Sequence, residues 1–398
     1  MSVHVATLHT DEDLHAASAV FRAAMVGLPP SPPDSDHLSE PGRTLGARID
    51  GQLVGTAESY TSWLVVPGGT RVPHAAVTHV GVLPTHTRRG VLTSLLRTQL
   101  HDIADRGEVV ATLRASEGSI YERFGYGVAS SFATFDIRRS RARLRDTVPG
   151  SGPVRFVEPG QAWKLFPQIY ATADVSWTGA IARPEYWWTR RELGATPPLY
   201  TVTHGPAGAE DGFARYHPVD TASWFTSPER VIVVDDLVAT TPQAYIGLIR
   251  HLLTVDLVDK VTIAFAPVDA SLRHLFADER AVQVAAVRDE TWLRLVDVAA
   301  ALARRTYRDA PPVIIEVDDA ILSANTGRYR VAADAVTRVD DAPDVSVDVA
   351  TLGAVYLGGS TWAQLALAGR VVEHRPGSVD AADTLFATPT QPFSGTFF

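Results

Sequence analysis

The chain has 398 residues, of which 45% are hydrophobic and 20% charged, and its net charge at pH 7 is −9. This length predicts two or three domains, because single hydrophobic cores rarely grow much beyond about 250 residues. The negative charge argues against a general nucleic-acid binder, and the lack of cysteine excludes disulfides, thiolate catalysis and thiolate metal ligands.

Nothing in the residue pattern indicates a membrane or secreted protein. No run of about 18 apolar residues occurs, and the first residues lack the charged and then apolar layout of a secretory signal. The thirteen histidines show no metal-ligand spacing. We therefore expect a cytoplasmic protein with no metal, no membrane contact and no nucleic-acid partner.

The first third of the chain alternates strand and helix patterns. Residues 4–8 predict a strand, and Thr10 is placed to cap a helix with an acidic first turn. Residues 27–36 hold four prolines and predict an irregular loop, which we interpret as a lid on the substrate side. Two strands are expected at 45–59 and 69–82, then a helix with its apolar face at 91–103 and a strand at 109–113. This order predicts an α/β domain with one parallel crossover.

A basic turn joins the strand at 69–82 to that helix. The segment reads Val-Gly-Val-Leu-Pro-Thr-His-Thr-Arg-Arg-Gly over residues 80–90. Such a junction points several backbone N–H groups and a helix N-terminus at one place, which suits a pyrophosphate. The alternative is a basic turn that only caps the helix, but the flanking strand, Pro84 and the leucine periodicity favour a cofactor site. The expected cofactor contacts are Val80, Gly81, Val82, Thr87, Arg88, Arg89, Gly90, Val91 and Leu92.

A second motif, Ala-Ser-Glu-Gly-Ser-Ile-Tyr-Glu-Arg-Phe-Gly-Tyr-Gly over residues 115–127, follows the strand at 109–113. Tyr126 lies between two glycines, so its ring can be presented to a cleft, whereas we expect Tyr121 and Phe124 to pack under the sheet. A phenol stays protonated at neutral pH, which suits a general acid. Ser116 and Glu117 at the start of the motif are added to the predicted cofactor contacts.

The middle of the chain partly repeats the first third. Strands are predicted at 156–159, 231–238 and 261–265, with helices at 163–175 and 244–253. Residues 239–244 stand where the first third has its basic turn, and they contain no arginine. We interpret 149–290 as a degenerate copy of a domain at 1–148, without a nucleotide site. The boundary is placed at a charged stretch that ends in Pro-Gly-Ser-Gly-Pro at 149–153.

Residues 291–398 differ from both preceding parts. Alternating strands are predicted at 312–317, 327–333 and 345–349, with short helices at 351–357 and 361–368, so we expect helices packed on an antiparallel sheet. The last residues read Gln-Pro-Phe-Ser-Gly-Thr-Phe-Phe. Burial of each phenylalanine is worth roughly 1.5–3 kcal/mol, so Phe397 and Phe398 predict a docked tail with a fixed terminal carboxylate. A tail tucked on the surface without a role remains the alternative.

These segments together resemble the Eis (enhanced intracellular survival) family of GCN5-related N-acetyltransferases. The resemblance rests on residues 80–90, 115–127, Trp-Leu-Arg-Leu at 292–295, Val-Tyr-Leu-Gly-Gly at 355–359 and the aromatic tail. It implies an α/β (α+β) fold with tandem acetyltransferase (GNAT) domains at 1–148 and 149–290. A sterol-carrier-like domain follows at 291–398, and the assembly is a homo-hexamer. Only the first domain is expected to be active.

The resemblance also implies a chemistry. Acetyl-CoA is the co-substrate and the acceptor is a primary amine of a cationic small molecule, aminoglycoside-like or a polyamine. Tyr126 is the general acid, the carboxylate of Phe398 the general base, and the N–H of Val82 faces the thioester oxygen.

The family's acidic residue and tryptophan in the early loop have no match here, and Phe397 replaces its penultimate acid. We therefore expect a less acidic pocket, with Asp34, Asp36 or Glu40 as substitutes and aminoglycosides as poor substrates. The other interpretations are a lysine or peptide N-acetyltransferase and a non-catalytic acyl-CoA or lipid-binding protein.

Overall fold

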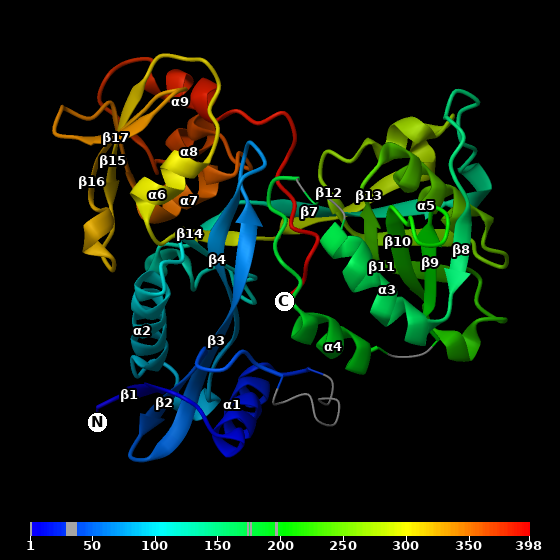
Figure 1. Ribbon diagram of the computed structural model, residues 1–398, viewed down its shortest axis with the longest axis horizontal. Coiled ribbons are helices and arrows are strands. Elements are labelled where there is room, and N and C mark those ends of the chain that lie inside the picture. Colours follow the sequence, from blue (N-terminus) through cyan, green and yellow to red (C-terminus); the bar gives the residue numbers. More distant parts are fainter. Residues whose placement is uncertain (1, 29–37, 173–174, 176, 196–197) are drawn as a thin grey trace. The chain divides into compact units, whose positions relative to one another are not determined.

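The computed structural model describes residues 2–28, 38–172, 175, 177–195 and 198–398 (Figure 1). Most of the predicted lid at 27–36, with Asp34 and Asp36, lies outside the described residues. The chain divides into two compact units. The first contains Met1–Ser130, Trp177–Ala182 and Asp289–Phe398, and the second contains Ser131–Ser176 and Arg183–Arg288.

A seven-stranded sheet forms the centre of the first unit. Its strands are ordered β1 (His4–Thr7), β2 (Thr44–Ile49), β3 (Gln52–Val65), β4 (Arg71–Val82), β5 (Val110–Leu113), β14 (Trp292–Leu295) and β6 (Gly127–Val128). Only the β4–β5 pair is parallel. Helices α1 (Asp11–Ala24) and α2 (Val91–Asp105) cover opposite faces (Figure 1). A Cβ on Gly55 would lie 2.7 Å from Val91 of α2, and one on Gly81 would lie 3.1 Å from Phe21 of α1.

Local signals explain the first elements. The Thr10 side chain accepts a hydrogen bond from the N–H of Asp13 and caps α1, as predicted. The single strand expected at 45–59 is a hairpin instead, because Asp50 and Gly51 adopt left-handed backbone at φ 49° and 82°. Two consecutive positive-φ residues form the two-residue turn that joins β2 to β3. Asp-Gly is a strong hairpin signal that the sequence interpretation missed.

The C-terminal part of the first unit is a five-stranded sheet with four helices. The strands are ordered β17 (Val336–Val339), β16 (Gly327–Val331), β15 (Val313–Asp318), β18 (Val345–Asp348) and β19 (Val372–Glu373). The helices are α6 (Val298–Arg304), α7 (Val349–Tyr356), α8 (Trp362–Leu367) and α9 (Ser378–Phe386). The expected sheet is present, but β15 and β18 run parallel, so it is mixed and not wholly antiparallel.

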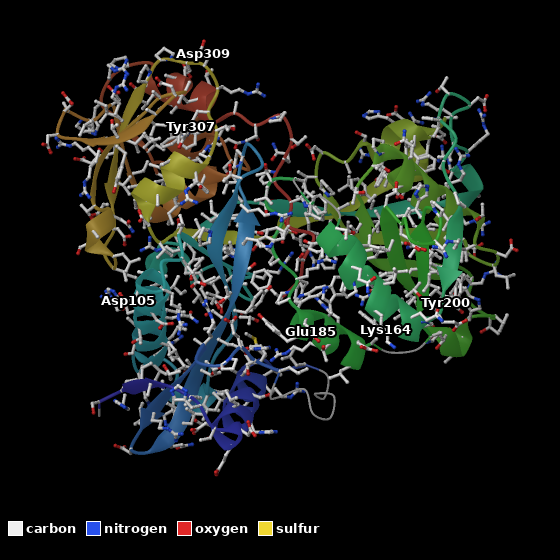
Figure 2. The ribbon with its side chains drawn as sticks, in the orientation of Figure 1. Asp105, Lys164, Glu185, Tyr200, Tyr307 and Asp309 are labelled. Atoms are coloured by element: carbon white, nitrogen blue, oxygen red, sulfur yellow. The ribbon has the colours of Figure 1, made fainter. Side chains whose placement is uncertain are left out.

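The second unit is built around its own seven-stranded sheet. The order is β13 (Val282–Asp289), β7 (Ser131–Arg138), β12 (Lys260–Pro267), β11 (Val231–Ala239), β10 (Gly212–Pro218), β9 (Tyr200–His204) and β8 (Val154–Val157). Its helices are α3 (Pro159–Thr172), which carries Lys164 in Figure 2, α4 (Glu185–Leu193) and α5 (Pro242–Thr254). Apart from the additional helix α4, the elements from β8 to β12 follow the order found from β1 to β5, and β11–β12 is again the parallel pair.

Strand pairing places the domain boundaries differently from the sequence interpretation. Strand β7 was assigned to the first domain, which was expected to end at 148, but it pairs in the second unit's sheet. Strand β14 was assigned to the last domain, which was expected to begin at 291, but it lies between β5 and β6. Consecutive strands thus belong to different sheets, a feature that composition along the chain does not encode.

Among the residues that the structure describes, no helix is both long enough and apolar enough to cross a membrane.

Candidate active site

The basic turn before α2 has the geometry of an anion site. Arg88 and Gly90 both adopt left-handed backbone, at φ 60° and 79°, which curves the chain so that successive N–H groups line a concave surface. No side chain caps α2, and its first intrahelical bond runs from the N–H of Ser94 to the oxygen of Gly90. The first amides of the helix therefore remain available for a ligand. Thr87, Arg88 and Arg89 are exposed beside them.

Strand β4 contributes a backbone donor next to this turn. The N–H of Leu83 donates to the oxygen of Val54, which makes Gly55 and Val82 a non-hydrogen-bonded pair of the β3–β4 ladder. The N–H of Val82 therefore points away from β3. On that other side β5 has ended, because the β4–β5 register runs only from His74↔Val110 to Val77↔Leu113. This edge of β4 is where the thioester contact was predicted.

The remaining predicted cofactor contacts split into two groups. Val80 and Val91 are buried in the hydrophobic core, so only their backbone can face a ligand, whereas Leu92 is partly buried against the same core. Gly81 is buried under α1. Ser116 and Glu117 are exposed in the loop after β5, where Glu117 accepts a hydrogen bond from Ser119.

Tyr126 is fully buried, with 0% of its surface exposed, and its ring is not presented to an open cleft as the sequence suggested. Gly125 has φ 85°, while Gly127 allows close approach, since a Cβ there would clash with the oxygen of Ala350 in α7. The Tyr126 hydroxyl has no hydrogen-bond partner among the described residues. Burial raises the pKa of Tyr126 above its ordinary value, an effect that Arg294 partly opposes.

The last residues of the chain are held by a buried carboxylate that the sequence analysis did not identify. Glu290, 1% exposed, accepts hydrogen bonds from the N–H groups of Ser394 and Gly395 at 2.8 and 2.9 Å. It also accepts from the Ser130 hydroxyl at 2.8 Å and from Arg114 at 3.0 Å. These four bonds fix the backbone of the tail within the first unit.

Arg114 completes this attachment. Its guanidinium donates to the oxygen of Thr396 at 2.7 and 3.0 Å and lies 5.2 Å from the ring centroid of Phe397. Burial lowers the pKa of Arg114 and the neighbouring Glu290 opposes that shift, so the pair holds its charge through mutual neutralisation. We call Arg114 and Glu290 the tail latch.

The two terminal aromatic residues behave differently. The ring of Phe398 meets Tyr60 of β3 edge-to-face at 5.8 Å and packs against a core cluster shared by the central sheet and the C-terminal part of the first unit. Phe397 is 51% exposed. The tail is docked, as predicted, but buried polar bonds hold it more than the burial of two phenylalanines.

The sequence analysis also did not identify a pair formed by His79 of β4 and Glu58 of β3. His79 adopts φ 48° in β4, at an irregularity where Thr56 and Glu58 are paired with Gly81 and Thr78, so that β4 carries one extra residue. The His79 ring nitrogen Nδ1 lies 2.5 Å from the carboxylate of Glu58, and the ring contacts Phe21 of α1 at 4.7 Å. Glu58 and Tyr60 are two residues apart on β3 and so share one face of the sheet.

Two further results concern the predicted acidic groups and metals. Glu40 accepts hydrogen bonds from both the N–H and the hydroxyl of Thr61, each at 2.6 Å, so its carboxylate is engaged with β3. Within the described ranges, no three histidine, aspartate or glutamate side chains are grouped as a metal site.

Family models match all three parts of the chain. One model of an acetyltransferase (GNAT) domain matches residues 7–129, a second with the same description matches 179–295, and a sterol carrier protein domain matches 298–395. With the mixed sheets and the turn before α2, they define an acetyltransferase of the GNAT class with two GNAT domains and a sterol-carrier-like domain. The predicted fold class is confirmed.

Comparison with similar proteins identifies the family within this class. N-acetyltransferase Eis of Mycobacterium bovis BCG is 33% identical over 355 residues, which cover 86% of this chain and 85% of that protein. An uncharacterized N-acetyltransferase of Streptomyces avermitilis is 37% identical over 371 residues, 89% of each chain. The crystal structure of Eis1 from Mycobacterium abscessus aligns over 100% of both chains with a TM-score of 0.93 and 52% identity. The chain belongs to the Eis family of N-acetyltransferases.

Proposed function

We propose that this N-acetyltransferase transfers the acetyl group of acetyl-CoA to a primary amine of a cationic small molecule, a polyamine or an aminoglycoside-like compound. Tyr126 acts as the general acid and the terminal carboxylate of Phe398 as the general base. The observation that carries the proposal is the tail latch, which attaches the end of the chain to the unit that also contains the turn before α2.

The residues at the predicted cofactor site fit the shape and charge of acetyl-CoA. The open amides at the start of α2 and the exposed Arg88 and Arg89 suit the pyrophosphate. The N–H of Val82, directed to the edge that β5 leaves uncovered, suits a thioester oxygen, and one such donor is typically worth about 2.7–4 kcal/mol of barrier. Acetyl-CoA supplies an activated acetyl group, and the products are an amide and a free thiol.

The two proposed catalytic groups divide the proton transfers. A terminal carboxylate has an intrinsic pKa of about 3.3–3.7, so it is ionised at neutral pH, attracts a cationic amine and accepts its proton. Because Glu290 neutralises Arg114, the latch adds no net positive charge beside that base. The Tyr126 hydroxyl, kept protonated by burial, donates to the departing sulfur.

The acceptor pocket is proposed to be less acidic than a multiply cationic antibiotic would require. The carboxylate of Glu40 already accepts a hydrogen bond from the N–H of Thr61, and the position before the terminal residue carries the exposed ring of Phe397. We therefore expect weak turnover of aminoglycosides; because polyamines are also multiply cationic, charge alone does not rank the two acceptor classes. The homo-hexamer implied by the family resemblance stays a prediction, which light scattering of the purified protein tests.

The decisive experiment measures thiol release from acetyl-CoA with a colorimetric disulfide reagent across polyamines, aminoglycosides and lysine peptides. The protein contributes no background because it contains no cysteine. Release that depends on a polyamine or aminoglycoside supports the proposal. Release only with lysine peptides replaces it with a peptide N-acetyltransferase, and binding of acetyl-CoA without turnover on any amine indicates a binding protein.

A further inference from the structure

The side chain of Arg294, in β14 of the first unit, is completely buried, with 0% of its surface exposed. An arginine is almost never fully buried unless it is paired. Here each of the three guanidinium nitrogens donates: Nε to the oxygen of Phe124 at 3.0 Å, Nη1 to the oxygen of Leu295 at 2.7 Å, and Nη2 to both carboxylate oxygens of Asp319 at 2.7 Å. One side chain thus joins the central sheet, the loop that carries Tyr126 and the C-terminal part of the unit.

Asp319 is fixed as firmly as the arginine with which it pairs. It directly follows β15 and is 4% exposed. Besides Arg294, its carboxylate accepts hydrogen bonds from the N–H groups of Ile321 and Leu322 at 3.1 and 3.0 Å and from the side-chain amide of Asn325 at 2.8 Å. A buried ion pair is seldom needed for stability alone, because apolar residues of similar volume often stabilise a core as well. What this fully bonded pair adds is a fixed direction for the guanidinium group.

The loop between β5 and β6 lies against this guanidinium group. The loop contains a 3₁₀ turn, Glu122–Phe124, and helices of this kind have weak hydrogen-bond geometry. The bond from Arg294 to the oxygen of Phe124 is made two residues before Tyr126. Gly125, between them, has φ 85°, and a Cβ there would lie 2.6 Å from the Nε of Arg294. The guanidinium group therefore contacts the backbone that sets the position of Tyr126.

The C-terminal part of the unit holds the same loop at two more places. A Cβ on Gly127 would clash with the oxygen of Ala350, so α7 packs directly on the residue after Tyr126. Arg370 forms an ion pair with Glu122 at 2.6 Å, but the two side chains are 28% and 53% exposed, so this pair is worth only about 0–1 kcal/mol. The Tyr126 hydroxyl has no hydrogen-bond partner among the described residues. The position of the phenol is therefore set by the packing of its ring and by the backbone of its loop.

We propose that Arg294, held in place by Asp319, is a positioning residue for acetyl transfer: it fixes the loop so that the Tyr126 hydroxyl faces the departing sulfur. This inference rests on the proposed role of Tyr126 as the general acid. A displacement of about 1 Å in a reacting group can cost a factor of about 100 in rate, so the precision of the loop matters for kcat. The C-terminal part of the unit then serves the reaction by orienting the acid as well as by supplying the tail.

Replacing Arg294 with lysine tests the proposal, because lysine keeps the charge but removes the fork. One ammonium group cannot bond the oxygen of Phe124 and the carboxylate of Asp319 with the geometry of the branched guanidinium group. We expect kcat to fall about tenfold or more with little change in the KM for acetyl-CoA, since Arg294 lies outside the turn before α2. The matched control is Arg328→Lys in β16, an arginine whose ion pair with Glu316 is partly exposed; this variant should keep the wild-type kcat.

The same substitution in the Tyr126→Phe background separates positioning from a general weakening of the fold. If Arg294 acts through Tyr126, Arg294→Lys lowers kcat in the wild type but changes it by less than about twofold once the hydroxyl is absent. An equal fractional loss in both backgrounds, or no loss in the wild type, overturns the inference alone. An unchanged kcat in Tyr126→Phe refutes the general acid of the proposed function, and the inference falls with it.

Hydrogen exchange measured by mass spectrometry gives a readout that needs no activity. The amides of residues 121–127 should exchange faster in Arg294→Lys than in the wild type, while those of α2 exchange equally in both. Unchanged exchange of the loop overturns the inference. Should Arg294→Lys fail to fold, as judged by circular dichroism, Thr326→Val takes its place in all three measurements. It removes the hydroxyl that accepts from the N–H of Asp319 at 3.1 Å, so a smaller loss of kcat with the same dependence on Tyr126 is expected.

Discussion

Replacing Glu290 with glutamine tests whether the tail latch supports catalysis. In the wild type, one carboxylate oxygen accepts from Ser130 and Ser394 and the other from Arg114 and Gly395. Glutamine keeps the shape of the side chain but replaces one oxygen with an NH₂ group. That group is a donor and would face the N–H of either Ser394 or Gly395, so one of the two bonds from the tail backbone is lost whichever way the amide is oriented.

The size of the effect follows from these bonds. A hydrogen bond to a charged group contributes about 1.5–3 kcal/mol, and one bond to the tail is lost, so tail attachment weakens by about 1.5–3 kcal/mol. The lost free energy promotes local detachment of the tail and leaves the sheets folded, because the latch contacts only the last residues and the ends of strands. We expect kcat to fall about tenfold or more, with a much smaller change in the unfolding temperature.

Two readouts are needed for Glu290→Gln. Thiol-release kinetics report kcat, and timed carboxypeptidase digestion followed by mass spectrometry reports whether the tail is detached. Glu279→Gln is the matched control, since Glu279 is an exposed acid paired with Arg145 at 3.3 Å, an ion pair worth about 0–1 kcal/mol. Wild-type kcat in Glu290→Gln with a freely digested tail would refute the catalytic role of the tail, and a tail still protected would refute the estimated energy.

Three more results are expected. Tyr126→Phe should lower kcat strongly with little change in acetyl-CoA affinity, and an unchanged kcat removes Tyr126 from the mechanism. Deletion of Phe398, or a C-terminal tag, should abolish most turnover while circular dichroism stays unchanged; a fully active tagged protein excludes the terminal base. Burial lowers the pKa of His74 from 6.5 to about 3, so the unfolded state binds the extra proton and stability is lost as pH falls from 6.5 toward 3. At pH 4.5 this protonation lowers the free energy of unfolding, measured by urea denaturation, by about 3 kcal/mol. The variant His74→Gln cannot titrate and should lack this loss. The same dependence of the unfolding free energy on pH in both proteins would contradict the expectation.

The elements that the sequence predicted well are governed by local interactions. Helix α2 follows from leucines at turn spacing, and the cap of α1 follows from Thr10 beside an acidic turn. The turn at 87–90 was predicted because glycine and its neighbours encode backbone conformation over a few residues. The missed hairpin at Asp50 and Gly51 was equally local and could have been found from the Asp-Gly signal.

The site was predicted less completely than the fold. The motif around Tyr126 indicated a functional tyrosine, but its full burial follows from the approach of α7 to Gly127, which no local pattern expresses. The aromatic tail indicated docking through two phenylalanines, whereas Phe397 is half exposed and the attachment is polar. An isolated glutamate such as Glu290 carries no sequence signal until its four partners are known.

The sequence by itself therefore determined several of the helices, most strands, the basic turn and the family. Tertiary structure decided which strands share a sheet and what holds the tail. Arg114 is 176 residues from Glu290 and 282 from Thr396. Short-range periodicity and turn chemistry reflect contacts between neighbours in the chain, but contacts across such separations exist only once the chain has closed those long loops.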